Sequence, residues 1–122
     1  MRGTFVVTNN NLQETFNTFN ARFFGGRLNP GIKVMFKKDL RVGGKKSRFA
    51  DAMWLPEIFQ IWISDRFSRS EPASYISLLH EMVHVDIMET YVGQEWGQGR
   101  HGMIFLAEHV RLFKAGAYDG LL

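Results

Sequence analysis

The stretch that decides the fold reads Leu79-His80-Glu81-Met82-Val83-His84, with two histidines four positions apart. On an α-helix, residues four apart are turned by about 40° and displaced by roughly 6 Å, so both imidazoles can reach one metal ion. Glu81 is turned by about 100° from His80, toward the water molecule that such an ion binds. The spacing therefore predicts a helix that carries a metal site, with His80 and His84 as ligands.

The residue types in this stretch are those of a zinc site that activates water. Zinc lowers the pKa of a bound water to about 7, and Glu81 can take its proton as general base and later give it to a leaving amine. Because the chain has no cysteine, disulfides, Cys-ligated zinc ribbons, iron–sulfur clusters and thiol nucleophiles are excluded. The alternative interpretation is a pair of core histidines beside a surface glutamate.

A catalytic zinc ion commonly has three protein ligands, which leaves two candidates for the third. Ile87 and Thr90 stand where the metzincin pattern needs glycine and histidine, so that subclass is excluded. His101 and Glu108 remain, and His101 is favoured because it precedes Gly102, where the backbone can approach a metal closely.

Further residues of the same region are candidates for supporting roles. His109 is interpreted as a core or supporting residue rather than a ligand. A carboxylate that orients a ligand is expected among Asp86, Glu89 and Glu108, and the sequence does not choose between them.

The rest of the chain predicts a small α+β domain. Apolar spacing and helix-ending glycines predict three helices, over residues 9–24, 70–91 and 101–115. Turn signals separate three extended segments, expected to pair as an antiparallel meander: Ile32–Lys37, Ser47–Trp54 and Phe59–Ser64. With 122 residues, 45% of them hydrophobic, the chain has room for one domain over residues 1–122.

Basic residues are concentrated in one segment. Residues 33–48 hold seven basic residues and one acid, against eight basic and eleven acidic residues elsewhere. This distribution favours contact with phosphate, so DNA binding by the loop 37–48 is expected. The candidates are Lys37, Lys38, Arg41, Lys45, Lys46 and Arg48. Phe36, Phe49 and Trp54 are candidates for stacking on bases, although a place in the core is favoured for each of these three rings. The alternative is a solvated hairpin loop.

The apolar runs are too short for a transmembrane helix or a secretory signal peptide. No membrane and no disulfide partner is expected, and the predicted location is the cytoplasm, with association with DNA or the nucleoid as an option.

Several motifs together resemble the SprT-like zinc metalloprotease domain of bacterial SprT proteins and eukaryotic Spartan. They are Phe23-Phe24-Gly25-Gly26-Arg27-Leu28, Ile61-Trp62-Ile63-Ser64, the histidine motif, and His101-Gly102 followed by Phe105. The resemblance implies a zincin-like minimal protease fold, zinc ligation by His80, His84 and His101, and catalysis by Glu81. It also implies cleavage of proteins bound or crosslinked to DNA.

Two departures from this pattern concern targeting to DNA. The Cys-rich zinc ribbon common in SprT proteins is impossible here, and Asp51 stands where a glycine is expected. A protease must also hold extended peptide, and the segment Phe59–Ser64 is expected to be the edge strand to which substrate pairs, through Ile61, Trp62 and Ile63.

The leading hypothesis is a zinc-dependent endopeptidase that acts on DNA-associated proteins. A non-enzymatic nucleic-acid-binding module with a structural metal, and a zinc hydrolase of another substrate class such as an amidase, are the alternatives.

Overall fold

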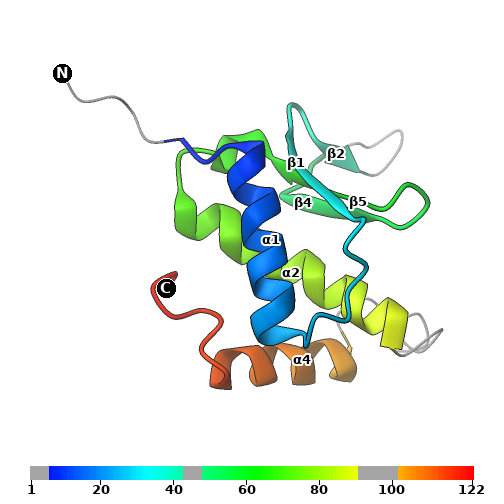
Figure 1. The fold of residues 1–122 in the computed structure, drawn as a ribbon. Helices are drawn as coiled ribbons and strands as arrows, with labels where there is room; N and C mark the ends of the chain where they lie inside the picture. Colours follow the sequence, from blue (N-terminus) through cyan, green and yellow to red (C-terminus); the bar gives the residue numbers. More distant parts are fainter. Residues whose placement is uncertain (1–5, 43–47, 91–101) are drawn as a thin grey trace.

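The computed structural model describes residues 6–42, 48–90 and 102–122, which fold as an α+β structure (Figure 1). Its helices are α1 (Asn9–Phe23), α2 (Glu71–Thr90) and α4 (Met103–Lys114), with a short 3-10 helix η2 (Asp65–Phe67) before α2. Its strands are β1 (Lys33–Lys37), β2 (Arg41–Val42), β3 (Arg48–Phe49), β4 (Ala52–Leu55) and β5 (Gln60–Ser64). The expected α+β class is therefore confirmed.

The first helix begins and ends close to where its sequence predicts. Thr8 is the N-cap: its hydroxyl accepts from the Asn11 backbone N–H, and the Asn11 side chain accepts from the Thr8 N–H. This reciprocal capping satisfies two backbone groups that a helix start otherwise leaves unpaired. After Phe23, Gly25 and Gly26 adopt positive φ angles of 61° and 71°, which end the helix at little steric cost.

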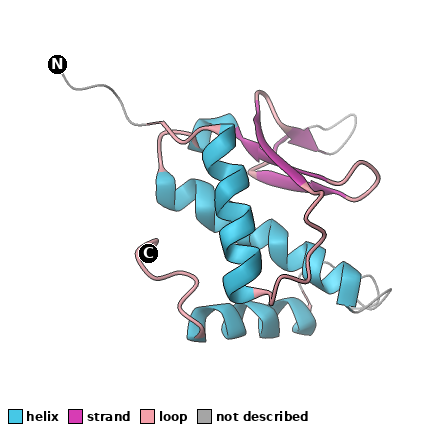
Figure 2. Cartoon of the chain, in the orientation of Figure 1, coloured by secondary structure: helices cyan, strands magenta, loops and turns pink. Residues whose placement is uncertain are grey.

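The expected antiparallel meander is wrong. The main sheet has the order β1–β5–β4, with β1 parallel and β4 antiparallel to β5 (Figure 2). The expected single strand over 47–54 is divided, because β3 pairs with β2 as a separate two-stranded ladder, whereas β4 pairs with β5. The Ala50 N–H donates to the Leu40 carbonyl at this division, so the chain changes partner there.

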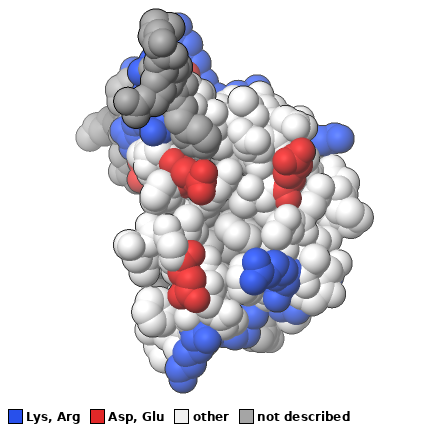
Figure 3. Space-filling view, turned by 60° about the vertical axis from the view of Figure 1, so that its left-hand side comes forward, with Lys and Arg blue, Asp and Glu red and all other residues white. Residues whose placement is uncertain are grey.

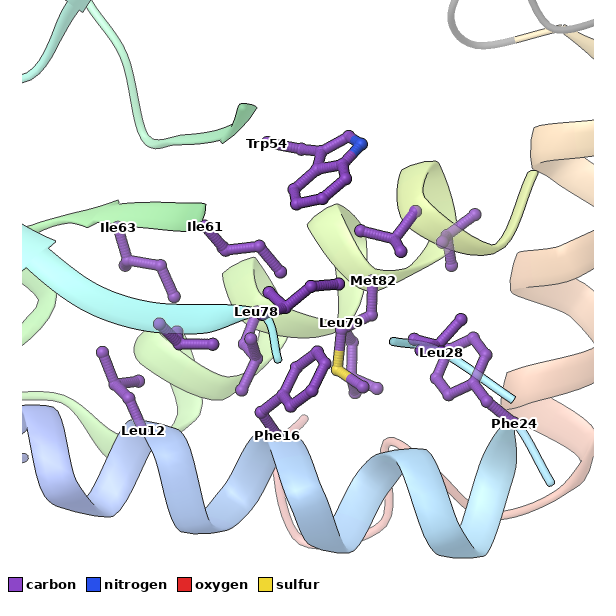
Figure 4. Close-up of a cluster of buried hydrophobic side chains, with 14 of the residues drawn as sticks. Leu12, Phe16, Phe24, Leu28, Trp54, Ile61, Ile63, Leu78, Leu79 and Met82 are labelled. Atoms are coloured by element: carbon purple, nitrogen blue, oxygen red, sulfur yellow. The ribbon is translucent and has the colours of Figure 1, made fainter. Parts of the chain in front are cut away.

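The core lies between the sheet and the helices α1 and α2 (Figure 4). The sheet contributes alternate residues, since Val34, Ile61 and Ile63 are buried and come from positions of one face. Fully buried side chains of the helices pack against them, among them Leu12, Phe16, Leu78, Leu79 and Met82. Each such side chain contributes about 1.5–3 kcal/mol by burial, and together they fix α2 against the sheet.

The two C-terminal helices also follow the sequence prediction closely. Helix α2 spans Glu71–Thr90 and α4 spans Met103–Lys114, and α4 packs against α2. Among the residues that the structure describes, no helix has the length and apolar content needed to span a bilayer.

Candidate metal centre

Helix α2 holds His80, Glu81 and His84 where the core meets the surface. Around them Leu79 and Val83 are completely buried. His84 is 2% exposed and Glu81 5%, whereas the His80 side chain is 40% exposed. The group is therefore reachable from solvent on the His80 side and closed on the His84 side.

The side chains of these three residues converge. One potential ligand atom from each of them lies within 4.8 Å of the others. The His80 Nε2 atom is 3.8 Å from the Glu81 Oε2 atom, and the two imidazole centroids are 5.1 Å apart. Two nitrogens that share a tetrahedral zinc ion lie about 3.3 Å apart, given Zn–N bonds of about 2.0–2.1 Å. The two imidazoles are donors of the type that zinc takes, and they converge with a carboxylate, so the donor set fits a divalent metal ion.

Aromatic rings from α4 pack against the two histidines. The Phe105 centroid lies 5.0 Å from that of His80 and 4.8 Å from that of His84. His109 follows one turn later, 4.5 Å from Phe105 and 5.8 Å from His80. Its Nδ1 atom is 2.6 Å from the Tyr118 hydroxyl, and burial raises the pKa of Tyr118 to about 12. The expected supporting position of His109 is consistent with these contacts.

A network of charged side chains joins both neighbouring helices to α2 behind the histidines. Arg27 donates two hydrogen bonds of 3.0 Å to Asp86, and Thr90 donates to the same carboxylate. On α4, Arg111 donates to both carboxylate oxygens of Glu108 and to the Phe23 carbonyl. The candidate supporting carboxylates Asp86 and Glu108 therefore connect helices.

Asp86 and Glu108 contact each other and differ in proton affinity. Burial raises the pKa of Glu108, and the hydrogen bond to Asp86 raises it further. Burial opposes ionisation of Asp86 as well, but hydrogen bonds from Glu108 and Arg27 hold its pKa below the usual value. Glu108 therefore has the higher proton affinity of the two carboxyl groups, and Asp86 is the more readily ionised one. Burial also raises the pKa of the third candidate, Glu89.

A cavity of ≈ 250 Å³ opens beside His80 and Glu81. Its lining comes from the start of β4 and from one side of α2: Asp51, Ala52, Ile76, Ser77, His80 and Glu81. Strand β4 is an outer strand of the three-stranded sheet. The cavity thus lies between an outer strand and the candidate metal ligands.

The expectation that β5 is the edge strand is wrong. Strand β5 pairs with β1 on one side and β4 on the other, so it is the central strand. Ile61 and Ile63 are completely buried, and Trp62 lies on the opposite face of the sheet. The expected substrate contacts of Ile61, Trp62 and Ile63 required an edge strand. Among the described residues, the strand next to the cavity that has a strand neighbour on one side alone is β4.

Three basic residues of the segment 37–48 have described side chains, namely Lys37, Lys38 and Arg41. Lys38 and Arg41 are exposed, and the Lys37 ammonium lies 4.6 Å from the centroid of the Trp62 ring. Lys45 and Lys46 lie outside the described residues, as does the expected third ligand His101, and the side chain of Arg48 in β3 is not described. On the face in Figure 3, charges of both signs form small separate clusters.

Two of the expected stacking residues belong to the core. Trp54 is 8% exposed and part of the hydrophobic cluster, and Phe36 packs against that cluster. The favoured core interpretation is therefore confirmed for both rings, which come from positions of the inner face of the sheet. The side chain of Phe49 lies outside the described part.

Comparison with known proteins gives one short similarity. No family model and no solved structure matches the chain. Proteins named "Chromosome segregation in meiosis protein 3" from Neosartorya fischeri and Aspergillus fumigatus are each 30% identical over 67 residues. Those residues are 55% of this chain and 24% of each fungal protein, so the match spans about a quarter of the length of these relatives.

Sequence reasoning missed Tyr118 and the contact between Arg27 and Asp86. Tyr118 is far from the motif in sequence, and no local pattern connects it with His109. The only available signal for Arg27 and Asp86 was their opposite charge. Arg27 follows the end of the first predicted helix, and Asp86 lies within the second.

Proposed function

We propose that this chain is a zinc-dependent metalloendopeptidase of the SprT-like type that cleaves DNA-associated proteins. The observation that carries the proposal is the convergence of His80, Glu81 and His84 on α2, beside a cavity that an outer strand also lines. A purely structural metal has no use for a carboxylate beside its ligands, whereas water activation requires a base. The glutamate within the motif therefore favours an enzyme over a binding module with a structural metal.

His80 and His84 would hold the zinc ion, with His101 as the proposed third ligand. Bound zinc would supply Lewis acidity and lower the pKa of a water ligand to about 7. Glu81 is 5% exposed, and its Oε2 atom is 3.8 Å from the His80 Nε2 atom. Its carboxylate can therefore accept a proton from water at this position and later donate the proton to the leaving nitrogen.

The outer strand β4 is the proposed place where substrate binds. An extended peptide can add to the outer edge of a sheet by backbone hydrogen bonds. Ala52 belongs to β4 and lines the same cavity as His80 and Glu81. A peptide paired with β4 would therefore pass the catalytic carboxylate.

The proposal that the substrates are DNA-associated has fewer supporting observations than the proposed metal site. It follows from the SprT-like motifs and from the basic residues of the segment 37–48. The short match to fungal proteins named for chromosome segregation agrees with a chromosomal setting.

The test compares the full chain with Glu81→Gln, a change that keeps shape and removes the base. Metal content is measured after purification without chelator, and cleavage is followed on a small basic protein crosslinked to single-stranded DNA. We expect about one zinc per chain in both proteins and cleavage by the parent alone. His84→Ala is expected to lose both metal and cleavage.

Three results contradict the proposal. Absence of bound metal in the parent removes the enzyme hypothesis altogether. Metal binding without cleavage, together with DNA binding that survives chelation, favours the non-enzymatic module. Cleavage of small amides but of no protein points to a hydrolase of another substrate class.

A further inference from the structure

One row of large side chains crosses the outer face of the sheet, away from the core. Strand register places Met35 of β1 and Met53 of β4 on either side of Trp62 in the central strand. All three are partly exposed, whereas Val34 and Ile61 on the opposite face are buried. We call the row Met35–Trp62–Met53 the sheet platform.

The central ring of the sheet platform is held in place. The Trp62 indole N–H donates to the Gln60 side chain over 2.7 Å, and the Lys37 ammonium lies 4.6 Å from the ring centroid. The polar atom of the ring is therefore satisfied within the protein. The Lys37 ammonium lies over one side of the ring, so a base that stacks on Trp62 would meet the partly exposed remainder of a ring that is fixed before binding, which lowers the entropy cost of association.

Positive charge accompanies this ring. Lys33 and Lys37 share one face of β1 and are four residues apart, which is about 13 Å along a strand. The sequences of β1, β4 and β5 contain these two lysines and no acid. Asp51, just before β4, is ion-paired with Arg66. The platform thus joins an aromatic ring to cationic groups without a competing carboxylate on its strands.

A second aromatic ring lies at the Lys33 end of β1. Phe59 precedes β5, its carbonyl accepts from the Lys33 N–H over 3.0 Å, and its side chain is 51% exposed. Its φ of 53° is in the left-handed region, which costs a residue with a Cβ about 1–2 kcal/mol. A strained backbone that presents an exposed ring is typical of a functional position.

We infer that the sheet platform binds single-stranded nucleic acid, with a base on Trp62 and the backbone phosphates near Lys33 and Lys37. Unpaired bases stack on aromatic rings, whereas the bases of a duplex are closed to such contact. An apolar protein partner would fit the methionines but would bury the two lysines without counter-charge. This surface is separate from the candidate metal centre, so the inference stands without the proposed peptidase activity.

The experiment measures fluorescence anisotropy of a labelled oligothymidylate of roughly 12 nucleotides, in chelator, over a series of salt concentrations. We expect Trp62→Ala to weaken binding by about 5- to 150-fold and Trp62→Phe to restore most of it. Replacing Lys33 and Lys37 together by Gln should lower the salt slope by about 0.7 for each lysine. Lys114→Gln is the matched control, because Lys114 is an exposed cation on α4, away from the sheet (Figure 1).

Each arm can overturn the inference. Unchanged affinity in Trp62→Ala, an unchanged salt slope in the double lysine variant, or tighter binding of duplex than of single strand would do so. Thermal unfolding establishes that each variant is folded. If Trp62→Ala does not fold, an oligonucleotide that contains iodouracil is photocrosslinked to the parent protein instead. The inference requires crosslinks within β1 or β5, and their absence would overturn it.

Discussion

Arg27, in the turn after α1, donates two hydrogen bonds of 3.0 Å to the Asp86 carboxylate. Asp86 is 1% exposed, so this contact places a fully buried carboxylate two residues beyond His84. The motif segment that ends α1 is thereby tied to the helix that carries the candidate ligands. It adds a polar link to the core packing by which α1 already contacts α2.

Arg27→Ala is expected to lower the free energy of unfolding by about 2 kcal/mol. Removing one partner of a buried pair leaves an uncompensated charge, and the cost falls below the usual range because Arg27 is half exposed. Urea unfolding measures the change. The double variant Arg27→Ala with Asp86→Asn should lose less than Arg27→Ala alone, and an equal or larger loss would contradict a charge-based role.

Glu108→Gln is expected to stabilise the protein near neutral pH. The pKa of Glu108 is raised, so its stabilising form is the protonated one, fully present below the unfolded value of about 4.5 and lost as the pH rises. Glutamine keeps a neutral donor toward Asp86 at every pH. Urea unfolding should show an advantage of the variant at neutral pH that shrinks below pH 4.5. A loss of stability at all pH values would mean that the ion pair with Arg111 dominates.

Tyr118 is expected to ionise with a pKa of about 12, because burial disfavours its charged form. Ultraviolet absorbance of tyrosinate measures this ionisation, and Tyr118→Phe should lack it. Since the folded pKa exceeds the unfolded value of 10.0, the parent should lose stability as the pH rises from about 10 to 12. The variant should show less of this loss, at a cost of about 1 kcal/mol for the hydrogen bond to His109. Equal alkaline curves would contradict the assignment.

Two substitutions of Phe59, to glycine and to alanine, both remove the ring and differ in how well they adopt the positive φ. Phe59→Gly should be more stable than Phe59→Ala by about 1 kcal/mol, the reverse of the usual order, because glycine adopts positive φ without steric cost. Thermal unfolding measures the difference. The two variants should bind oligothymidylate equally weakly, and a difference in affinity between them would show that the backbone rather than the ring matters.

Chelation is expected to lower the unfolding temperature of the parent. A ligand that binds only the folded state stabilises it by mass action. The same shift should occur in Glu81→Gln, since that residue is the proposed base, and should vanish in His84→Ala. A shift that persists in His84→Ala would place the metal elsewhere.

The helices could be predicted because their determinants are local. The spacing of His80 and His84 and the glycines after Phe23 both act within a few residues. The order of strands in the sheet could not be predicted, because it depends on pairing between distant segments. Lys33 pairs with Gln60, and no feature of either residue distinguishes a parallel partner from an antiparallel one.

The candidate site likewise has one part that the sequence predicts and one part that depends on tertiary packing. The donors on α2 follow from one turn of helix, whereas the approach of Phe105, His109 and Tyr118 depends on how α4 packs. Trp54 and Trp62 are the same type of residue and both lie in strands. Only the alternation of side chains along the two strands places the Trp54 indole in the core and the Trp62 indole on the outer face.

The central position of β5 has a consequence for internal motion. Its amide groups have neighbours on both sides, and through η2 it leads directly into α2. Slowest hydrogen exchange is therefore expected in β5 and the adjoining turns of α2. Strand β4, which has only one strand neighbour among the described residues, should exchange faster, while the helix that bears the histidines stays anchored to the most protected part of the molecule.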